Sequence, residues 1–141
     1  MLDQAAARLE REGIADQVTL VHGDARRVDE LVAAELGGAP LDALLITLFM
    51  SVVPAWREVY ARAFSLLAPG GRCCVISFHS LEDRIVKQYF NAHARVDPVY
   101  AGLPNIPPEA LPTLAKIGRL VRPSEAECAA NPRARSARLR I

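Results

Sequence analysis

The sequence predicts an α/β fold with a mostly parallel sheet, and three of its features indicate this class. The apolar run from Cys73 to Phe78 lacks the alternation of a half-exposed strand, so it suits a parallel strand covered on both faces. Residues 41–47 form a second strand that we expect to be buried. Between the two runs, apolar side chains recur at helical spacing, at Trp56, Val59, Tyr60, Ala63, Phe64 and Leu67.

The first forty residues add two helices and one more strand. Residues 5–12 read as the end of a helix that stops at Gly13, so we expect that a preceding segment is missing. A short strand is predicted at residues 18–21 because this run is rich in β-branched side chains. Residues 26–36 then form a helix that the following glycine pair ends.

The stretch from residue 67 to residue 87 organises the rest of the chain. A proline and two glycines at residues 69–71 are expected to form a turn, and residues 72–78 the strand. Ser80 and Asp83 have the spacing of a helix-capping pair, which predicts a helix from Leu81 to about His93. Its buried face would carry Leu81, Ile85, Val86, Tyr89 and Phe90, while Asp83 and Lys87 pair on the exposed face.

The corner between this strand and this helix would lie at the carboxyl edge of the sheet, where open α/β folds bind ligands. It carries five chemically active side chains, His79, Ser80, Glu82, Asp83 and Arg84. Two interpretations stay open. Ser80 and Asp83 can be a capping pair with solvated neighbours, or the acceptors at this edge can take part in a reaction.

The last third of the chain begins with a proline-rich crossing. Residues 97–112 hold five of the ten prolines, which predicts a long surface segment without regular structure. A strand at residues 116–122, a short helix opened by a second capping box at residues 123–127, and a strand at residues 136–141 follow.

The charge is distributed unevenly. The net charge is only +1, but residues 116–141 carry seven Lys or Arg against two Glu, a local balance of +5. Such a basic segment suits contact with nucleic acid, although it can equally be a solvated face.

Other features favour a cytoplasmic protein without a membrane span or a metal site. The start has no basic region of a secretory signal, and the apolar run at residues 43–56 is too short to cross a bilayer. Cysteines 73, 74 and 128 and the three histidines lack metal-binding spacing, so reduced thiols are expected.

Two motifs carry a family resemblance. Residues 70–87, with Ile76-Ser77-Phe78-His79-Ser80-Leu81-Glu82-Asp83-Arg84 at their centre, closely resemble the RsmH (MraW) family. Residues 131–140 are similar to the C-terminal signature of that family, and residues 101–104 and 122–125 keep a family-like spacing. These enzymes are bacterial small-subunit rRNA methyltransferases that methylate a cytosine exocyclic amine with S-adenosylmethionine. The resemblance covers about the last half of the chain.

The resemblance implies a fold, a cofactor and a partner. The fold would be a partial Rossmann-like class I methyltransferase sheet, with residues 116–122 and 136–141 as a C-terminal antiparallel strand pair. S-adenosylmethionine would be the cofactor, and 16S rRNA of the small ribosomal subunit the partner. We expect residues 1–96 to be an incomplete methyltransferase core and residues 97–141 to be the crossing and basic strand pair of the same domain.

The resemblance also implies site residues. The catalytic candidates are His79, Ser80, Glu82 and Asp83, and the RNA-binding candidates are Arg84, Lys87, Arg133, Arg135 and Arg138. Residues 18–25 are similar to the third strand and exit turn of class I methyltransferases, which border the adenine. The cofactor candidates are therefore Asp24, Ala25 and Thr47. Taken alone, Asp24 favours the interpretation of a helix N-cap for the following helix.

The chain departs from the family pattern in its first half. A first strand with a glycine-rich loop and the acidic residue after the second strand are absent, Thr47 stands where the family has Asp, and Ala25 where it has Phe. Only about eight residues separate Thr47 from Trp56, where the family inserts a helical domain. Residues 46–57 are instead similar to small-molecule and lipid-modifying methyltransferases. Three functions therefore stay open: an rRNA cytosine methyltransferase or a fragment of one, a non-catalytic remnant that binds RNA or a partner, and a small-molecule or lipid methyltransferase.

Overall fold

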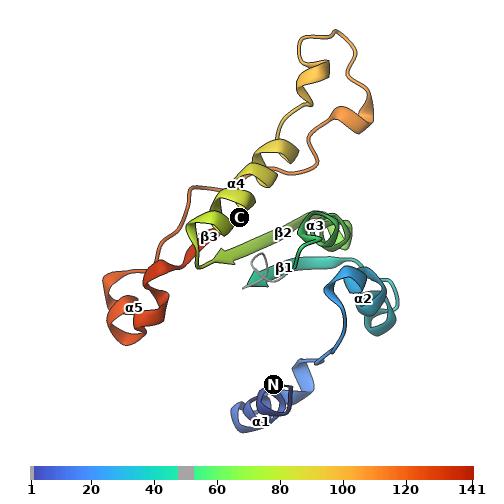
Figure 1. Ribbon diagram of the computed structural model, residues 1–141. Helices are drawn as coiled ribbons and strands as arrows, with labels where there is room; N and C mark the ends of the chain where they lie inside the picture. The colour runs from blue at the N-terminus through green and yellow to red at the C-terminus, as the bar shows by residue number, and fades with distance from the viewer. Residues whose placement is uncertain (1, 48–52) are drawn as a thin grey trace. The chain divides into compact units, whose positions relative to one another are not determined.

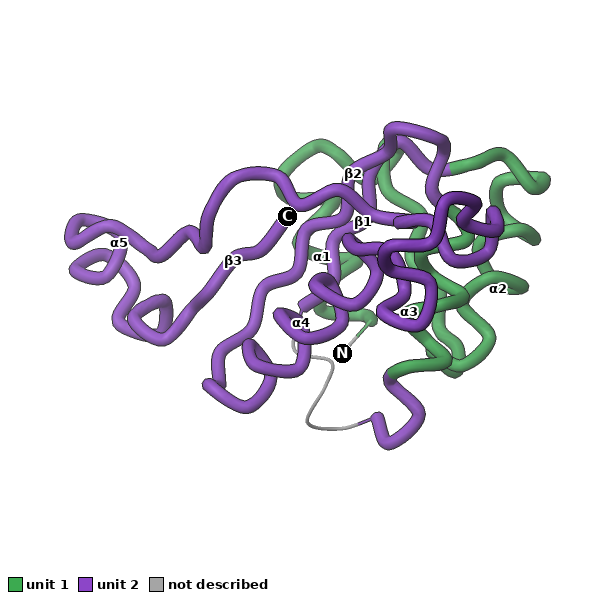
Figure 2. The backbone as a smooth tube through the Cα atoms, turned by 90° about the horizontal axis from the view of Figure 1, so that it is seen from above, with its two compact units in different colours: residues 1–40, 57–66 green, residues 41–56, 67–141 purple. Residues whose placement is uncertain are grey.

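The computed structural model describes residues 2–47 and 53–141 (Figure 1). The strands are β1 (Leu41–Thr47), β2 (Leu67–Ser77) and β3 (Arg138–Arg140). The helices are α1 (Leu2–Glu12), α2 (Val28–Leu36), α3 (Trp56–Ser65), α4 (Ser80–His93) and α5 (Glu125–Ala130). The chain forms two compact units, residues 1–40 with 57–66, and residues 41–56 with 67–141 (Figure 2). They are called unit 1 and unit 2 below.

Unit 2 is built on a three-stranded mixed sheet with the order β1-β2-β3. β1 runs parallel to β2, with Leu44 opposite Cys73 and Thr47 opposite Ile76. β3 runs antiparallel to β2, with Val75 opposite Arg140. The predicted α/β class, a partial Rossmann-like sheet with an antiparallel strand at its end, is confirmed.

The two parallel strands are buried to different degrees. In β2, Cys73, Val75 and Ser77 are buried and the residues between them are half-buried, so one face is fully covered. In β1 no residue is fully buried, and Leu45 is 63% exposed. The expectation that β1 is a buried strand is wrong, because within the described residues β1 is an edge strand with a neighbour on one side only.

β2 begins earlier than the sequence predicts and includes the proline and both glycines of the expected turn. Gly70 has a positive φ of 83°. A Cβ atom on Gly71 would lie 2.9 Å from the carbonyl oxygen of Ala68 and 3.0 Å from that of Leu41. The β1–β2 register is irregular between Leu41 and Ala43. The glycine pair therefore lets β2 start against β1 through a bulge instead of a turn.

α4 begins differently from the predicted capping pair. His79 is the N-cap and makes no side-chain capping bond, whereas Ser80 is already the first helical residue. The backbone N–H of Asp83 donates to the carbonyl of His79, and the Asp83 carboxylate binds two arginines of β3. The predicted Ser80–Asp83 cap and the predicted Asp83–Lys87 pair are therefore wrong.

The buried face of α4 also differs from the predicted one. Val86 and Phe90 are buried as expected, but Leu81 is 61% exposed. Glu82 and Asp83 are buried instead, at 4% and 8% exposure. The first turn of α4 therefore turns its carboxylates, and not its leucine, toward the protein.

In unit 1 the predicted helices form and the predicted strand does not. Residues 18–21 have no strand partner among the described residues and no regular structure. Asp24 caps the 3₁₀ turn Ala25–Arg27 that leads into α2, since its carboxylate accepts from the backbone N–H of Arg26. Arg62 of α3 donates to Asp29 of α2 at 3.1 Å and ties these two helices together.

The final part of unit 2 contains one strand where two were predicted. β3 forms, but residues 116–122 make only an isolated antiparallel bridge, from Val121 to Leu139. α5 is capped as expected, because the hydroxyl of Ser124 accepts from the backbone N–H of Glu127 at 3.1 Å.

The proline-rich segment after α4 forms two short 3₁₀ turns, Pro98–Tyr100 and Pro108–Ala110. It runs out beyond the end of α4 and returns (Figure 1). Its base is closed by backbone bonds from Thr113 and Leu114 to the carbonyl of His93.

Candidate functional site

The carboxyl ends of the two parallel strands meet at one edge of the sheet in unit 2. Thr47, the last residue of β1, is opposite Ile76, which precedes His79 by three residues. Parallel strands end at the same edge, and this is the edge at which open α/β folds bind ligands. Two predicted site residues, Thr47 and His79, therefore share this edge, and both side chains are exposed.

His79 and Ser80 line a hollow of about 250 Å³, which we call the corner hollow. Its other residues come from the chain before α5 and from the segment that leads into β3: Arg122, Arg135, Ser136, Ala137 and Arg138, with Phe78 from the corner itself. Three guanidinium groups, one imidazole and two hydroxyls surround it, and no carboxylate lines it. This chemistry suits an anionic ligand such as a phosphate group.

Asp83 fixes the position of β3 against the start of α4. Its carboxylate accepts from Arg140 through two bonds, of 2.7 and 3.1 Å, and from Arg138 at 3.4 Å. Burial by itself raises the pKa of this carboxyl, but the hydrogen bonds and charges of Arg140 and Arg138 together outweigh burial and lower the pKa below its ordinary value. Asp83 is therefore ionised at neutral pH and holds two basic side chains in place.

Glu82, next to Asp83 in the first turn of α4, also supports the corner. Its carboxylate accepts from the backbone N–H of Phe78 at 3.3 Å, just after β2 ends. The four predicted catalytic residues thus divide into two pairs. His79 and Ser80 face the corner hollow, and Glu82 and Asp83 are buried and hold the surrounding backbone and strand.

The predicted cofactor residues belong to different units. Asp24 and Ala25 lie in unit 1, and Thr47 lies in unit 2. Both carboxylate oxygens of Asp24 accept from the guanidinium group of Arg26. These side-chain bonds, with the backbone bond from Arg26, lower the pKa of Asp24 to about 2. The capping interpretation of Asp24 is therefore what the structure shows.

The predicted RNA-binding residues are also spread over several places within unit 2. Arg135 and Arg138 line the corner hollow. Lys87 lines a second hollow farther along α4, and Arg84 and Arg133 are exposed on the surface. Arg122 joins the corner hollow although the sequence did not assign it a role. Its signals in the sequence were its place in the basic segment 116–141 and the family-like spacing of residues 122–125.

Among the described residues, the buried Cys73 thiol and the possible metal ligands give no catalytic or metal site. Burial, with a smaller effect of the neighbouring Cys74, raises the pKa of Cys73 to about 12, so its thiol stays protonated. Across residues 2–47 and 53–141, no three His, Cys, Asp or Glu side chains gather as metal ligands. No helix in the same ranges is both long and apolar enough to pass through a membrane.

Comparison with known proteins gives a family match over most of unit 2. Residues 51–141 match the model of the MraW methylase family. The chain is 53% identical over 79 residues to the "Ribosomal RNA small subunit methyltransferase H" of Xylella fastidiosa strain M12, which covers 56% of this chain and 25% of the relative. It is 49% identical over 85 residues to the protein of the same name from Coxiella burnetii strain Dugway 5J108-111, or 60% of this chain and 27% of the relative. The chain thus spans about a quarter of the length of the curated relatives it matches.

Proposed function

This chain belongs to the MraW methylase family, and from that premise we propose that it supplies the RNA-contacting side of an S-adenosylmethionine-dependent methyltransferase. The substrate would be the exocyclic amine of a cytosine in 16S rRNA, in line with the names of the relatives. The enzyme would work in the cytoplasm on the small ribosomal subunit.

The corner hollow is the observation that carries this proposal. It places an imidazole and a hydroxyl beside three arginines at the carboxyl edge of the sheet. The arginines would bind phosphates on either side of the target nucleotide, because a guanidinium group pairs with phosphate through two bonds. His79 and Ser80 would then face the base itself.

His79 would manage the proton of the reaction. A cytosine amino group is a poor nucleophile because its lone pair is delocalised into the ring, so it must be positioned by acceptors and must lose a proton. S-adenosylmethionine would supply the methyl group. Ser80 would position the amino group, and the imidazole of His79 would accept the proton that the amino group loses.

The residues of this chain fit only part of the cofactor. Thr47 is exposed at the same sheet edge as His79, where the methionine end of the cofactor would lie. Asp24 does not fit the adenine as it stands, because Arg26 occupies both of its carboxylate oxygens. For this reason we assign Thr47 alone to the cofactor.

The test is methyl transfer from labelled S-adenosylmethionine to small-subunit RNA, with the 141-residue chain and its variants. His79→Ala should lower the rate by about 10²-fold or more, the scale of a lost acid–base contact, while the melting temperature stays within a few degrees. Gln88→Ala is the control and should change neither, because Gln88 is an exposed polar residue of α4 that does not line the corner hollow. Equal losses of stability and rate in His79→Ala would make the corner purely structural.

A second function is RNA binding without catalysis. The Asp24–Arg26 pair favours it, because Arg26 occupies the carboxylate that would otherwise bind the adenine of the cofactor. Isothermal titration with S-adenosylmethionine separates the two functions. Binding of the cofactor supports the methyltransferase. RNA binding by a chain that does not take up the cofactor would leave only the RNA-binding function. The third possibility, a small-molecule or lipid methyltransferase, depends on residues 46–57, of which residues 48–52 lie outside the described residues.

A further inference from the structure

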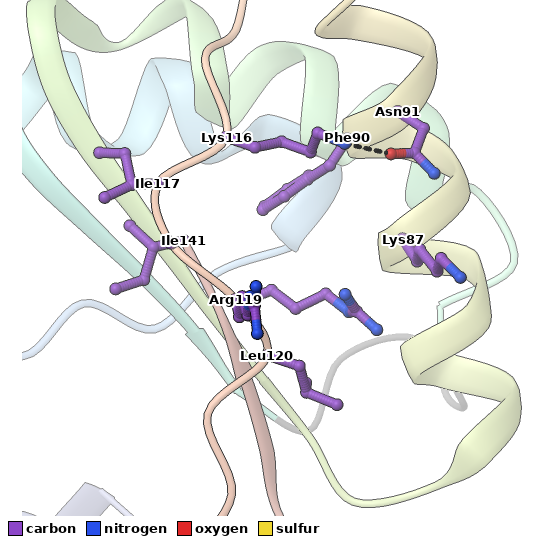
Figure 3. Close-up of a pocket in the computed structure, with 10 residues that line it drawn as sticks. Lys87, Phe90, Asn91, Lys116, Ile117, Arg119, Leu120 and Ile141 are labelled. Carbon is purple, nitrogen blue, oxygen red and sulfur yellow. Dashed lines mark hydrogen bonds between the residues drawn. The ribbon is translucent and has the colours of Figure 1, made fainter.

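A second basic hollow lies between α4 and residues 116–120, both within unit 2 (Figure 3). Its volume is about 230 Å³, and we call it the helix groove. α4 contributes Lys87, Phe90 and Asn91, and the extended segment opposite contributes residues 116–120. The last two residues of the sequence, Arg140 and Ile141, complete the lining.

The helix groove holds an excess of positive charge. Four cationic side chains line it, Lys87, Lys116, Arg119 and Arg140, and no Asp or Glu side chain does. The one anionic group in the lining is the main-chain carboxylate of Ile141, which accepts from the backbone N–H of Ile117 at 3.1 Å. Only Arg140 is neutralised, by Asp83. Lys116 donates to the neutral amide oxygen of Asn91 at 2.8 Å, as the dashed line in Figure 3 shows. Three cationic side chains, Lys87, Lys116 and Arg119, against the single carboxylate of Ile141 leave a net positive charge to attract an anion.

Two of these cations are available to a ligand. Among the residues that the structure describes, neither Lys87 nor Arg119 has a carboxylate within ion-pair distance, and both side chains belong to exposed residues. Phe90, which is 5% exposed, places an apolar ring between α4 and the extended segment beside these cations (Figure 3). An apolar wall strengthens the field of charges at its rim, because the low dielectric focuses field lines outward.

The helix groove and the corner hollow are neighbours along β3. Arg138 lines the corner hollow, and Arg140 lines the helix groove. Residues two apart on a strand point to the same face and lie about 7 Å from each other. Asp83 binds both arginines and so fixes the boundary between the two hollows.

We propose that the helix groove is a second phosphate-binding site, which holds a backbone phosphate of the same RNA strand whose target base enters the corner hollow. The ligand is a phosphodiester of single-stranded RNA, bound by Lys87 and Arg119 with Lys116 beside them. This inference rests on the proposed function for the identity of the anion. The groove itself is independent of the cofactor and of catalysis.

The experiment measures the affinity of the 141-residue chain for a fluorescent single-stranded RNA at several salt concentrations. The slope of log affinity against log salt counts phosphate contacts, at about 0.7 per contact for a single strand. The double variant Lys87→Gln with Arg119→Gln should reduce the slope by about 1.4. Arg95→Gln is the matched control, because Arg95 is exposed, follows α4 and lines neither hollow. It should leave the slope within 0.3 or so of the wild type.

The outcomes separate this inference from the proposed function. An unchanged slope in the double variant, with a normal thermal melt, would overturn the proposal that the helix groove binds phosphate. It would leave the proposed function of the corner hollow intact. If the RNA affinity of the wild-type chain does not change with salt concentration, both the helix-groove proposal and the proposed RNA contact of the corner hollow are wrong. Inhibition of RNA binding by cytidine monophosphate at equal phosphate concentration would also overturn the inference, because a site for a terminal phosphate is not a strand contact.

Discussion

Asp83 is a single carboxylate that connects the start of a helix to a strand 57 residues away in sequence. Its two bonds to Arg140 and its longer bond to Arg138 use both of its oxygens. Because Asp83 is only 8% exposed, loss of its charge would leave two guanidinium groups without a partner in a partly buried place.

We therefore expect Asp83→Asn to lower the free energy of unfolding by about 1–3 kcal/mol at neutral pH, measured by urea denaturation. Asp42→Asn, the same change at an exposed position of β1, should stay within about 0.5 kcal/mol of the wild type. A loss of the same size in both variants would contradict a specific role for Asp83.

The Asp83 contribution should also depend on pH in a defined direction. Its pKa is lowered in the folded protein, so its contribution is fully present above the ordinary carboxyl pKa of about 4 and is lost as the pH falls through the lower folded value. The difference in unfolding free energy between wild type and Asp83→Asn should shrink below about pH 4. A difference that stays constant down to about pH 2 would contradict the lowered pKa.

The same carboxylate shows what a local pattern can and cannot predict. Ser80 with Asp83 and Ser124 with Glu127 have the same spacing, yet only Ser124 forms a cap. The Asp83 carboxylate binds Arg138 and Arg140, which lie far along the chain, instead of taking part in a cap with Ser80. A rule that uses four neighbouring residues cannot include partners that the fold brings together.

At the level of elements, the two serines give a direct comparison. Ser124→Ala should destabilise α5 by about 0.5–2 kcal/mol, because the backbone N–H of Glu127 loses its acceptor. Ser80→Ala should change stability by less than about 0.5 kcal/mol, because its side chain makes no capping bond. Hydrogen exchange of the first-turn amides of α5 and α4 measures both. Faster exchange at the start of α4 in Ser80→Ala would contradict the assignment of His79 as N-cap.

The predicted strands formed where the fold supplied a partner strand, whether close in sequence, as for residues 41–47, or distant, as for β3 on β2. Residues 41–47 form β1 as expected, since β2 follows after a single helix. Residues 18–21 and 116–122 have suitable composition, yet the first forms no strand and the second only one bridge. β-propensity describes how well a side chain fits a pleated surface, and it cannot supply the neighbouring strand.

Across the whole molecule, burial is concentrated in a few elements. α1 and α2 contain no buried residue, whereas β2 and α4 contain seven of those that the structure describes as buried. The buried ones are Cys73, Val75, Ser77, Glu82, Asp83, Val86 and Phe90. Local stability should follow this distribution, because segments with few buried groups open at low cost.

Native-state hydrogen exchange should therefore show fast exchange in α1 and α2 and the slowest exchange in β2 and the middle of α4. The measurement is deuterium uptake of peptides from the full chain at neutral pH. Equal protection of α1 and β2 would contradict the prediction and would mean that α1 is held by contacts beyond those described.

The candidate site could be predicted only in outline. The strand-to-helix corner and the basic residues 135 and 138 were visible in the sequence, because they belong to compact motifs. Arg122 in the corner hollow and the facing of Lys87 toward Arg119 were not, since each depends on a segment that packs back from far along the chain.

The position of β3 also bears on the order in which the protein folds. The edge of β2 that carries Val75 is paired only when Arg140 arrives, 65 residues later in the chain. Closing so long a loop is slow relative to forming α4 or the β1–β2 pair, because the entropy of the loop must be lost before the pairing repays it. During that interval β2 has an open edge with unpaired backbone groups, which is a template for pairing with another chain. Refolding at high protein concentration should therefore lose yield to aggregation unless residues 138–140 are present to cover that edge.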